Sequence, residues 1–167
     1  MQDEFDIRYT EKADEQALLS WFSEEGELFH YPISEKREIA PFTRNWVAFS
    51  RFRAGLTAVS SQGTPLGMAT LYLMPYRKLA HKTLFYVMVD PSFRRKGIGF
   101  SLVKNIVHLA QTKFSLESVY CEVFDGSCIL PLLHQQSFSC FVEQNRYLKW
   151  GERYYKRYLL EKCFVGK

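Results

Sequence analysis

The chain has 167 residues, of which 47% are hydrophobic, 24% charged and 16% aromatic, and its 22 basic and 18 acidic side chains give a net charge of +4. A chain of this length buries roughly 70% of the surface that its unfolded form exposes, so we expect residues 1–167 to form a single soluble domain. It has no run near the roughly 18 apolar residues of a membrane span, and its acidic start is unlike a secretory signal. The four cysteines form no C-x-x-C pair, which favours reduced thiols in a cytoplasmic protein and no metal site.

Charge is unevenly distributed along the chain. Residues 1–38 carry 4 bases and 11 acids, a net −7, whereas residues 76–104 carry 7 bases and 1 acid, a net +6. Residues 144–167 carry 7 bases and 2 acids, a net +5. A nucleic-acid binder usually shows a basic stripe with aromatic residues placed to stack. Here the densest basic cluster, residues 94–96, adjoins two glycines, which favours a compact phosphate-bearing ligand. The charge of the two end segments, residues 1–38 and 144–167, is equally well explained as solvated surface.

Patterns of apolar residues predict the elements of the first half of the chain, and glycines and prolines mark its loops. Asp14 is placed to cap the first helix, and the glycine and proline between residues 60 and 66 suit the turn of a hairpin. In chain order we expect a strand over 5–9, a helix from Asp14 to Gly26, a loop over 28–41, a helix through Trp46 and Phe49, and hairpin strands over 55–60 and 66–74.

The second half is predicted to alternate buried strands with helices. The run over 83–89 is almost wholly apolar, which indicates a strand buried on both faces. A helix joins it to the strand over 118–124, so these two strands are expected to be parallel neighbours. The order of elements predicts a mixed α/β sheet in one domain. The remaining expected elements are a helix over 100–110, a helix over 127–136, and strands over 138–142 and 154–161.

The most informative segment is residues 90–99, DPSFRRKGIG in one-letter code, between a buried strand and an amphipathic helix. A short glycine-bearing turn that opens a helix directs several backbone N–H groups the same way, with the positive end of the helix dipole behind them. Gly97 and Gly99 remove side chains that would keep an anion away, and the three bases before them add attraction. Two common phosphate loops do not fit, because Leu102 stands where the dinucleotide fingerprint needs glycine and no Gly-Lys-Ser/Thr run is present. The segment therefore predicts a phosphate-binding turn of another kind.

This segment resembles the R/Q-x-x-G-x-G/A motif of the Gcn5-related N-acetyltransferase (GNAT) superfamily, with Arg94, Gly97 and Gly99 at the defining positions. A strand that ends in Val-Asp-Pro precedes the motif and an apolar helix follows it. The order of elements from Asp6 to Glu161 is also similar to that of the family. The resemblance implies an α/β (α+β) fold with a mostly antiparallel sheet of six or seven strands and about four helices. It also implies a central parallel strand pair that is splayed around the cofactor.

The resemblance implies acetyl-coenzyme A (acetyl-CoA) as the acyl donor, with no metal. Backbone N–H groups of the turn would hold the pyrophosphate, and the main chain of the preceding strand would bond the pantetheine and orient the acetyl carbonyl. Which basic side chain meets the 3′-phosphate stays open. The cofactor-binding residues that the resemblance implies are Val87, Met88, Val89, Arg94, Arg95, Lys96, Gly97, Ile98, Gly99 and Ser127.

Acetyl transfer to an amine needs a base that takes a proton from the nucleophile. Glu122 is a carboxylate inside a predicted central strand, which is costly unless it faces a cavity or a partner. Its position resembles that of the strand glutamate used as base in some protein N-terminal acetyltransferases; the alternative is a structural hydrogen bond or an outward-facing side chain. Members of the family often carry a tyrosine on the next helix that serves as the general acid for the departing thiolate, and Leu133 occupies that position here. His134, one residue further on, is the second catalytic candidate and would serve as this acid. The alternatives are that His134 is an ordinary surface histidine and that the thiolate leaves without a dedicated acid.

The resemblance implies that the acceptor site is formed largely by residues 24–31 and residues 147–158. The first segment is acidic and aromatic, which suits a cationic amine, and the second is basic and aromatic, which suits an anionic group. The expected function is therefore an N-acetyltransferase for a primary amine of a small molecule or a protein. The alternative is a catalytically silent member that binds acyl-CoA as a sensor or scaffold. No nucleic acid or membrane partner is expected, and a homodimer is left open.

Overall fold

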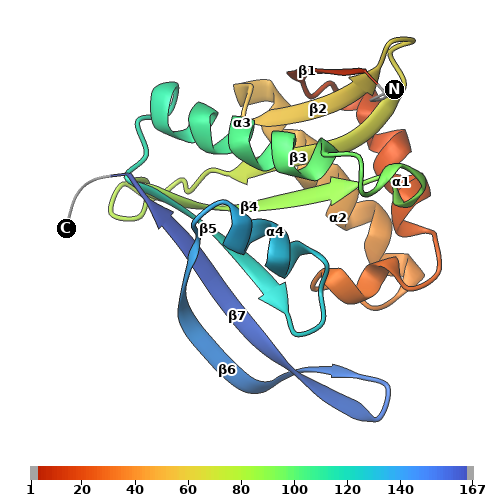
Figure 1. Cartoon of the computed structure of the whole chain (residues 1–167), viewed down its shortest axis with the longest axis vertical. Helices are drawn as coiled ribbons and strands as arrows, with labels where there is room; N and C mark the ends of the chain where they lie inside the picture. The colour runs from red at the N-terminus through yellow and green to blue at the C-terminus, as the bar shows by residue number, and fades with distance from the viewer. Residues whose placement is uncertain (1–3, 165–167) are drawn as a thin grey trace.

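One seven-stranded sheet forms the centre of the computed structural model, which describes residues 4–164 (Figure 1). The strand order is β1-β2-β3-β4-β5-β7-β6; β4 and β5 are parallel, and every other neighbouring pair is antiparallel. This is the mixed, mostly antiparallel sheet with one parallel pair that the resemblance implied. The strands are β1 (Phe5–Tyr9), β2 (Gly55–Ser60), β3 (Pro65–Tyr72), β4 (Lys82–Val89), β5 (Ser118–Phe124), β6 (Ser139–Trp150) and β7 (Arg153–Cys163).

Among residues 4–164, four α-helices cover the two faces of the sheet, with α3 and α4 on one face and α1 and α2 on the other (Figure 1). Residues of β4 alternate between the two layers. Phe85 contacts Phe138 just after α4, with ring centroids 5.7 Å apart, whereas Tyr86 stacks on Trp46 of α2 at 5.7 Å. The strand is therefore buried on both faces, as its continuous apolar run indicated. The helices are α1 (Glu15–Phe22), α2 (Lys36–Ala48), α3 (Ile98–Thr112) and α4 (Ile129–Gln135).

The parallel strands β4 and β5 part after a short stretch of pairing. Their register runs only from Lys82–Ser118 to Leu84–Tyr120, although both strands continue beyond it. On its other side β5 stays paired with β7 as far as Phe124. The backbone of β4 beyond Leu84 therefore has no strand partner on the β5 side, which leaves an opening in the middle of the sheet.

The second helix begins earlier than predicted. We expected a loop as far as Pro41, but α2 starts at Lys36 and contains Pro41. A capping box forms its first turn, since the Glu38 carboxylate accepts from the Glu35 N–H at 2.9 Å. Proline removes one helical hydrogen bond, and the buried Trp46 and Val47 further along supply the packing that outweighs this loss. The first helix is also shorter than expected, because it ends at Phe22 rather than at Gly26.

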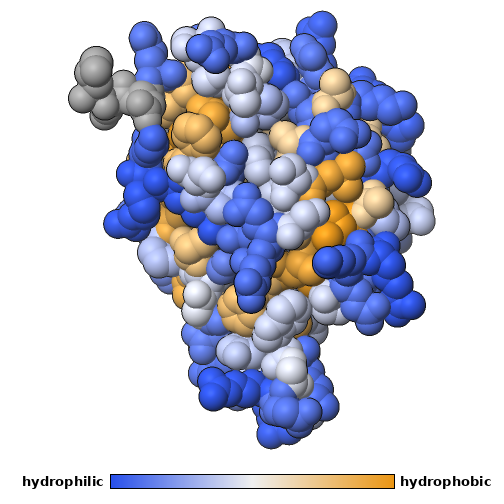
Figure 2. All heavy atoms as spheres, turned by 90° about the vertical axis from the view of Figure 1, so that its right-hand side faces the viewer, coloured by the Kyte–Doolittle hydropathy of each residue, from blue (hydrophilic) through white to orange (hydrophobic). Residues whose placement is uncertain are grey.

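The last two strands form a hairpin much longer than the predicted strands over 138–142 and 154–161. It projects away from the body of the molecule (Figure 1), and the projecting end is mainly hydrophilic (Figure 2). The polar run over 144–146 conceals the strand pattern, and the register of β6 shifts there, with Arg146 in a left-handed conformation at φ 52°.

No helix among residues 4–164 is long and apolar enough to cross a bilayer. All four cysteines are free thiols, with Cys121 buried and the other three exposed. Residues 1–3, which include part of the acidic start of the chain, and residues 165–167 lie outside the described range.

Candidate active site

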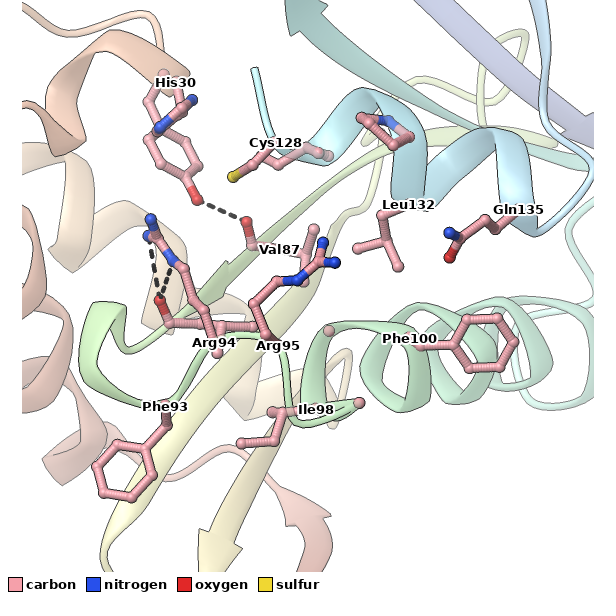
Figure 3. Close-up of a pocket in the computed structure, with 16 residues that line it drawn as sticks. His30, Val87, Phe93, Arg94, Arg95, Ile98, Phe100, Cys128, Leu132 and Gln135 are labelled. Carbon is pink, nitrogen blue, oxygen red and sulfur yellow. Dashed lines mark hydrogen bonds between the residues drawn. The ribbon is translucent and has the colours of Figure 1, made fainter. Parts of the chain in front are cut away.

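A cavity of about 570 Å³ lies where β4 and β5 part, a volume within the usual range for small-molecule sites (Figure 3). Its walls come from β4, the turn before α3, the first turn of α3, α4 and the 3-10 segment η2 (Glu27–His30) with the residue after it. Seven of the ten cofactor-binding residues implied by the resemblance line it: Val87, Val89, Arg94, Arg95, Gly97, Ile98 and Gly99.

The peptide groups of Val87 and Val89 are directed toward the opening between the strands. Asp90 donates its N–H to the Leu66 carbonyl of β3 at 2.9 Å, and backbone groups alternate along a strand, so the odd-numbered residues of β4 face β5. The two carbonyls have partners within the protein. Val87 accepts from the Tyr31 hydroxyl at 2.6 Å, and Val89 accepts from the Arg94 guanidinium at 3.3 Å (Figure 3). The N–H groups of Val87 and Val89 are left for a ligand in the opening.

The glycine turn ends at the N-terminus of α3. Gly97 caps this helix in a left-handed conformation with φ 83°, and Arg95 is also left-handed at φ 66°. Ser101 donates the first helical hydrogen bond, to the Gly97 carbonyl at 3.0 Å, so the N–H groups just before it have no partner inside the helix. At Gly99 a Cβ would lie 3.3 Å from the Leu132 side chain of α4, which shows how closely α4 covers this turn. The turn thus presents the N–H groups that an anion requires.

Arg94 makes an ion pair inside the protein. Its Nη1 and Nη2 atoms donate to the two Glu27 oxygens at 3.0 and 2.5 Å. Burial opposes the charge of Arg94, but the hydrogen bonds and charge of Glu27 outweigh burial and raise the pKa of the guanidinium. The side chain expected to attract a phosphate is therefore engaged by a carboxylate, whereas Arg95 extends across the cavity (Figure 3).

Sequence reasoning placed His30 and Tyr31 only in an acceptor segment, yet both line the cavity. His30 Nδ1 lies 3.1 Å from the Ser127 hydroxyl, and burial is the main cause that lowers the pKa of His30, with Arg94 acting in the same direction against Glu27. Burial likewise raises the pKa of Tyr31 well above its ordinary value. Residues in a loop have no periodic pattern from which the direction of their side chains can be predicted. The sequence therefore gives no signal that His30 and Tyr31 point into this cavity.

Glu122 lies on the sheet face that carries Tyr86, outside the residues that line the cavity. Its carboxylate accepts from Arg157 of β7 at 3.0 Å, and its side chain is 13% exposed. Burial raises the pKa of Tyr86, and the charge of Glu122 adds to this shift, so the two groups are close. Glu122 thus has the partner that a carboxylate in a central strand requires.

The remaining predicted residues lie around the cavity or away from it. Met88 of β4 is buried and does not line the cavity, and its sulfur accepts from the Tyr31 hydroxyl at 3.0 Å. Ser127 is buried against His30, and Lys96 lies over the Phe93 ring at 5.1 Å. His134 is exposed on α4 and does not line the cavity, whereas its neighbour Leu133 is completely buried.

The parted parallel strands and the glycine turn above them define the acetyltransferase class that the motif implied. A family model described as "Acetyltransferase (GNAT) family" matches residues 15–128, well over half of the chain. The chain belongs to the GNAT acetyltransferase family.

Solved structures share the fold at low sequence identity. The protein yncA from Salmonella typhimurium, solved with its cofactor acetyl-CoA, is 17% identical over 98% of this chain and 96% of its own, with a TM-score of 0.81. An N-acetyltransferase from Staphylococcus aureus Mu50 is 17% identical over 96% and 98%, with a TM-score of 0.77. A ribosomal-protein-alanine N-acetyltransferase from Brucella melitensis is 19% identical over 95% and 99%, with a TM-score of 0.76. No curated protein matches the sequence.

Proposed function

We propose that this protein transfers an acetyl group from acetyl-CoA to a primary amine. The observation that carries the proposal is the cavity itself, which joins two kinds of backbone donor. The turn at the start of α3 offers N–H groups that suit a diphosphate, and the open edge of β4 offers N–H groups that suit an amide-bearing chain. Acetyl-CoA has both parts in this order, and the similarly folded yncA was solved with it.

Each part of the cofactor has a matching wall. Backbone N–H groups of residues 95–99 would hold the pyrophosphate, with Arg95 adding charge. The N–H groups of Val87 and Val89 would bond the pantetheine arm as a neighbouring strand does. Ser127 lies at the entry to α4 beside His30 and would border the arm on its other side. Acetyl-CoA supplies an activated thioester; the protein positions its carbonyl carbon.

The nucleophilic amine must lose a proton, and two groups are placed to take it. Glu122 lies beside Tyr86 on the α2 side of the opening and accepts a hydrogen bond from Arg157. His30 lines the cavity, and its lowered pKa favours the neutral form that accepts a proton. We propose Glu122 as the base, acting through water, because it lies on the strand that forms the far wall of the opening. His30 is the alternative.

The acceptor would enter from the side of η2 and the β6–β7 hairpin. Phe29 of η2 contacts Tyr155 of β7 edge to face, with ring centroids 5.0 Å apart. The bases Arg157 and Lys156 of the hairpin are paired with Glu122 and Glu143. These two bases are therefore engaged by carboxylates, and the rings of Phe29 and Tyr155 offer aromatic faces that suit a cationic amine. The acceptor is an amine of a small molecule or of a protein.

Release of free thiol from acetyl-CoA tests the proposal. The protein is mixed with acetyl-CoA and a panel of amines that includes polyamines, amino acids, amino sugars and peptides with free N-termini or lysines. We expect thiol release that depends on at least one amine. Acetyl-CoA that binds without any amine-dependent release would instead support the silent sensor or scaffold, and failure to bind acetyl-CoA would overturn both readings.

A further inference from the structure

Tyr31 places a phenol hydroxyl at the open edge of β4. The hydroxyl donates to the Val87 carbonyl at 2.6 Å and lies 3.0 Å from the Met88 sulfur, and the residue lines the cavity although it is only 2% exposed. Its ring is fixed by edge-to-face contacts with Phe22 at 4.8 Å and Trp46 at 6.1 Å. The hydroxyl is therefore held at one place, where the two strands have parted.

Cleavage of a thioester produces negative charge at one atom. When the amine nitrogen bonds to the carbonyl carbon, the carbon–sulfur bond breaks and its electron pair moves to the sulfur. A hydrogen-bond donor fixed beside the sulfur stabilises this charge as it develops, without reorganisation at the moment of reaction. The cavity of an enzyme for this reaction should thus contain such a donor on its inner wall.

Other donors along the cavity are less suited to this task. Arg94 is paired with Glu27 and also donates to Val89. His30 is held by the Ser127 hydroxyl, and Cys128 has only a weak S–H donor, whose pKa burial raises further. On α4, Leu133 has no donor and His134 is exposed. Tyr31 also has a partner, the Val87 carbonyl, but its O–H can rotate away from that carbonyl while the ring stays fixed. Among the described residues that line the cavity, Tyr31 thus combines a strong neutral donor with a fixed position at the strand opening.

We infer that the Tyr31 hydroxyl donates a hydrogen bond to the sulfur of coenzyme A as the carbon–sulfur bond breaks, an inference that rests on the proposed function. The O–H turns from the Val87 carbonyl toward the sulfur and keeps its proton. The proton that the amine loses goes to the base described above, and the thiolate leaves as an anion that solvent protonates after release. No further reactant is needed.

The surroundings keep Tyr31 protonated. Burial is the main cause that raises its pKa; Cys128, Glu27 and Cys121 act in the same direction, and Arg94 opposes them. Full proton transfer from so weak an acid to a thiolate is unfavourable, because an ordinary thiol such as that of cysteine, with a pKa of about 8.5, is the stronger acid. A hydrogen bond without proton transfer is consistent with this raised pKa.

The test is the pKa of the thiol of coenzyme A when it is bound to the protein. Thiolate absorbance of the complex with free coenzyme A is followed against pH for the wild type, Tyr31→Phe and Tyr72→Phe. Tyr72 is the matched control, since it is a second tyrosine in the aromatic core, whose buried hydroxyl has no hydrogen-bond partner and which does not line the cavity. We expect Tyr31→Phe to raise the thiol pKa by about one unit or more, because a hydrogen bond to a charged group is lost, and Tyr72→Phe to leave it unchanged.

Turnover gives a second readout. With an amine found to be acetylated, Tyr31→Phe should lower kcat roughly 10- to 100-fold and change the KM for acetyl-CoA much less. An unchanged thiol pKa in Tyr31→Phe that still binds coenzyme A would overturn the inference. The titration needs no acceptor, so it tests the role of Tyr31 even if the wild type acetylates no amine. A wild type that acetylates no amine would instead contradict the proposed function. Coenzyme A binding also shows that each variant is folded.

Discussion

Arg94 of the glycine turn and Glu27 of η2 are 67 positions apart in the sequence, yet they form a two-pronged ion pair with distances of 3.0 and 2.5 Å. The pair connects the donor side of the cavity to the segment that carries His30 and Tyr31. The same segment makes two further contacts, from His30 to Ser127 and from Tyr31 to the Val87 carbonyl. The donor and acceptor sides are therefore fixed relative to each other by three polar contacts from five consecutive residues.

Glu27→Gln should weaken both folding and cofactor binding. The Arg94 side chain is 27% exposed and that of Glu27 is 11% exposed, so removing the carboxylate leaves a largely buried charge without its partner. We expect a loss of about 2 kcal/mol in the free energy of unfolding, below the cost for a fully buried pair, and a several-fold rise in the Kd for acetyl-CoA. Denaturant unfolding and calorimetry measure the two effects. Glu25→Gln, at an exposed position two residues earlier, is the control and should change neither; equal behaviour of the two variants would contradict the positioning role of Glu27.

Gly97→Ala should reduce the affinity for acetyl-CoA, whereas Gly63→Ala should not. The two glycines have nearly the same backbone, with φ of 83° and 82°, and a Cβ at either position would meet nothing within 4 Å. Both variants should thus lose about 1 kcal/mol of stability from the left-handed conformation. Only Gly97 lies at the N-terminus of α3, so we expect its variant alone to raise the Kd, by tenfold or more. A calorimetric titration that gives the same Kd for both variants would show that the turn does not hold the cofactor.

The fold follows from the sequence where local pattern and tertiary packing agree. The strand over 118–124 is predicted with its observed bounds, and the parallel pairing of β4 with β5 follows from the helix between them. Pro41 misled the prediction of α2, because the capping box at Glu35 and the packing of Trp46 outweigh the local penalty. The hairpin at the end was underestimated, since polar residues occupy exposed strand positions whose pairing is set by the partner strand.

The site is predictable only in the part that a contiguous motif encodes. Residues 94–99 indicate a phosphate-binding turn because the backbone conformation there depends on glycine within a few residues. The other wall is assembled over long sequence separations. Nothing local directs Tyr31 to the Val87 carbonyl or Glu27 to Arg94. The sequence alone shows that position 133 has no tyrosine, but it does not show that the hydroxyl of Tyr31, the residue after η2, reaches the cavity.

Glu122→Gln should lower kcat by about 10²-fold if this carboxylate takes the proton from the amine, since general bases contribute roughly 10²- to 10⁴-fold. The amide keeps the size of the side chain and still accepts a hydrogen bond from Arg157, so the KM for acetyl-CoA should change little. Glu143→Gln is the control, because Glu143 forms an exposed ion pair with Lys156 on the β6–β7 hairpin, which also carries Arg157. Steady-state kinetics with an active amine make the comparison. Full activity in Glu122→Gln together with a large loss in His30→Gln would move the role of base to His30.

Asp14→Asn should change stability in acid. Burial raises the pKa of this carboxyl, but hydrogen bonds from Arg8, the Glu11 N–H and Thr57 outweigh burial and hold it below the ordinary value of 3.8. A lowered pKa means that the native state binds fewer protons than the unfolded state. The stability that Asp14 contributes is therefore complete above pH 3.8 and is lost as the pH falls below it.

Denaturant unfolding over a range of pH should show that Asp14→Asn is less stable than the wild type at neutral pH, by about 2–3 kcal/mol. Its stability should also fall less steeply in acid. Asp6→Asn, on the exposed side of β1, serves as the control and should follow the wild type. The interpretation fails if the wild type and Asp14→Asn lose stability in parallel below pH 3.8.

The central claim is that the opening between β4 and β5 holds acetyl-CoA with its thioester beside Tyr31, and a crystal structure with acetyl-CoA tests it most directly. We predict pyrophosphate oxygens within hydrogen-bond distance of the N–H groups of residues 95–99, pantetheine amides on Val87 and Val89, and the sulfur next to the Tyr31 hydroxyl. A cofactor bound elsewhere, or a pantetheine arm that leaves the opening empty, would contradict the account.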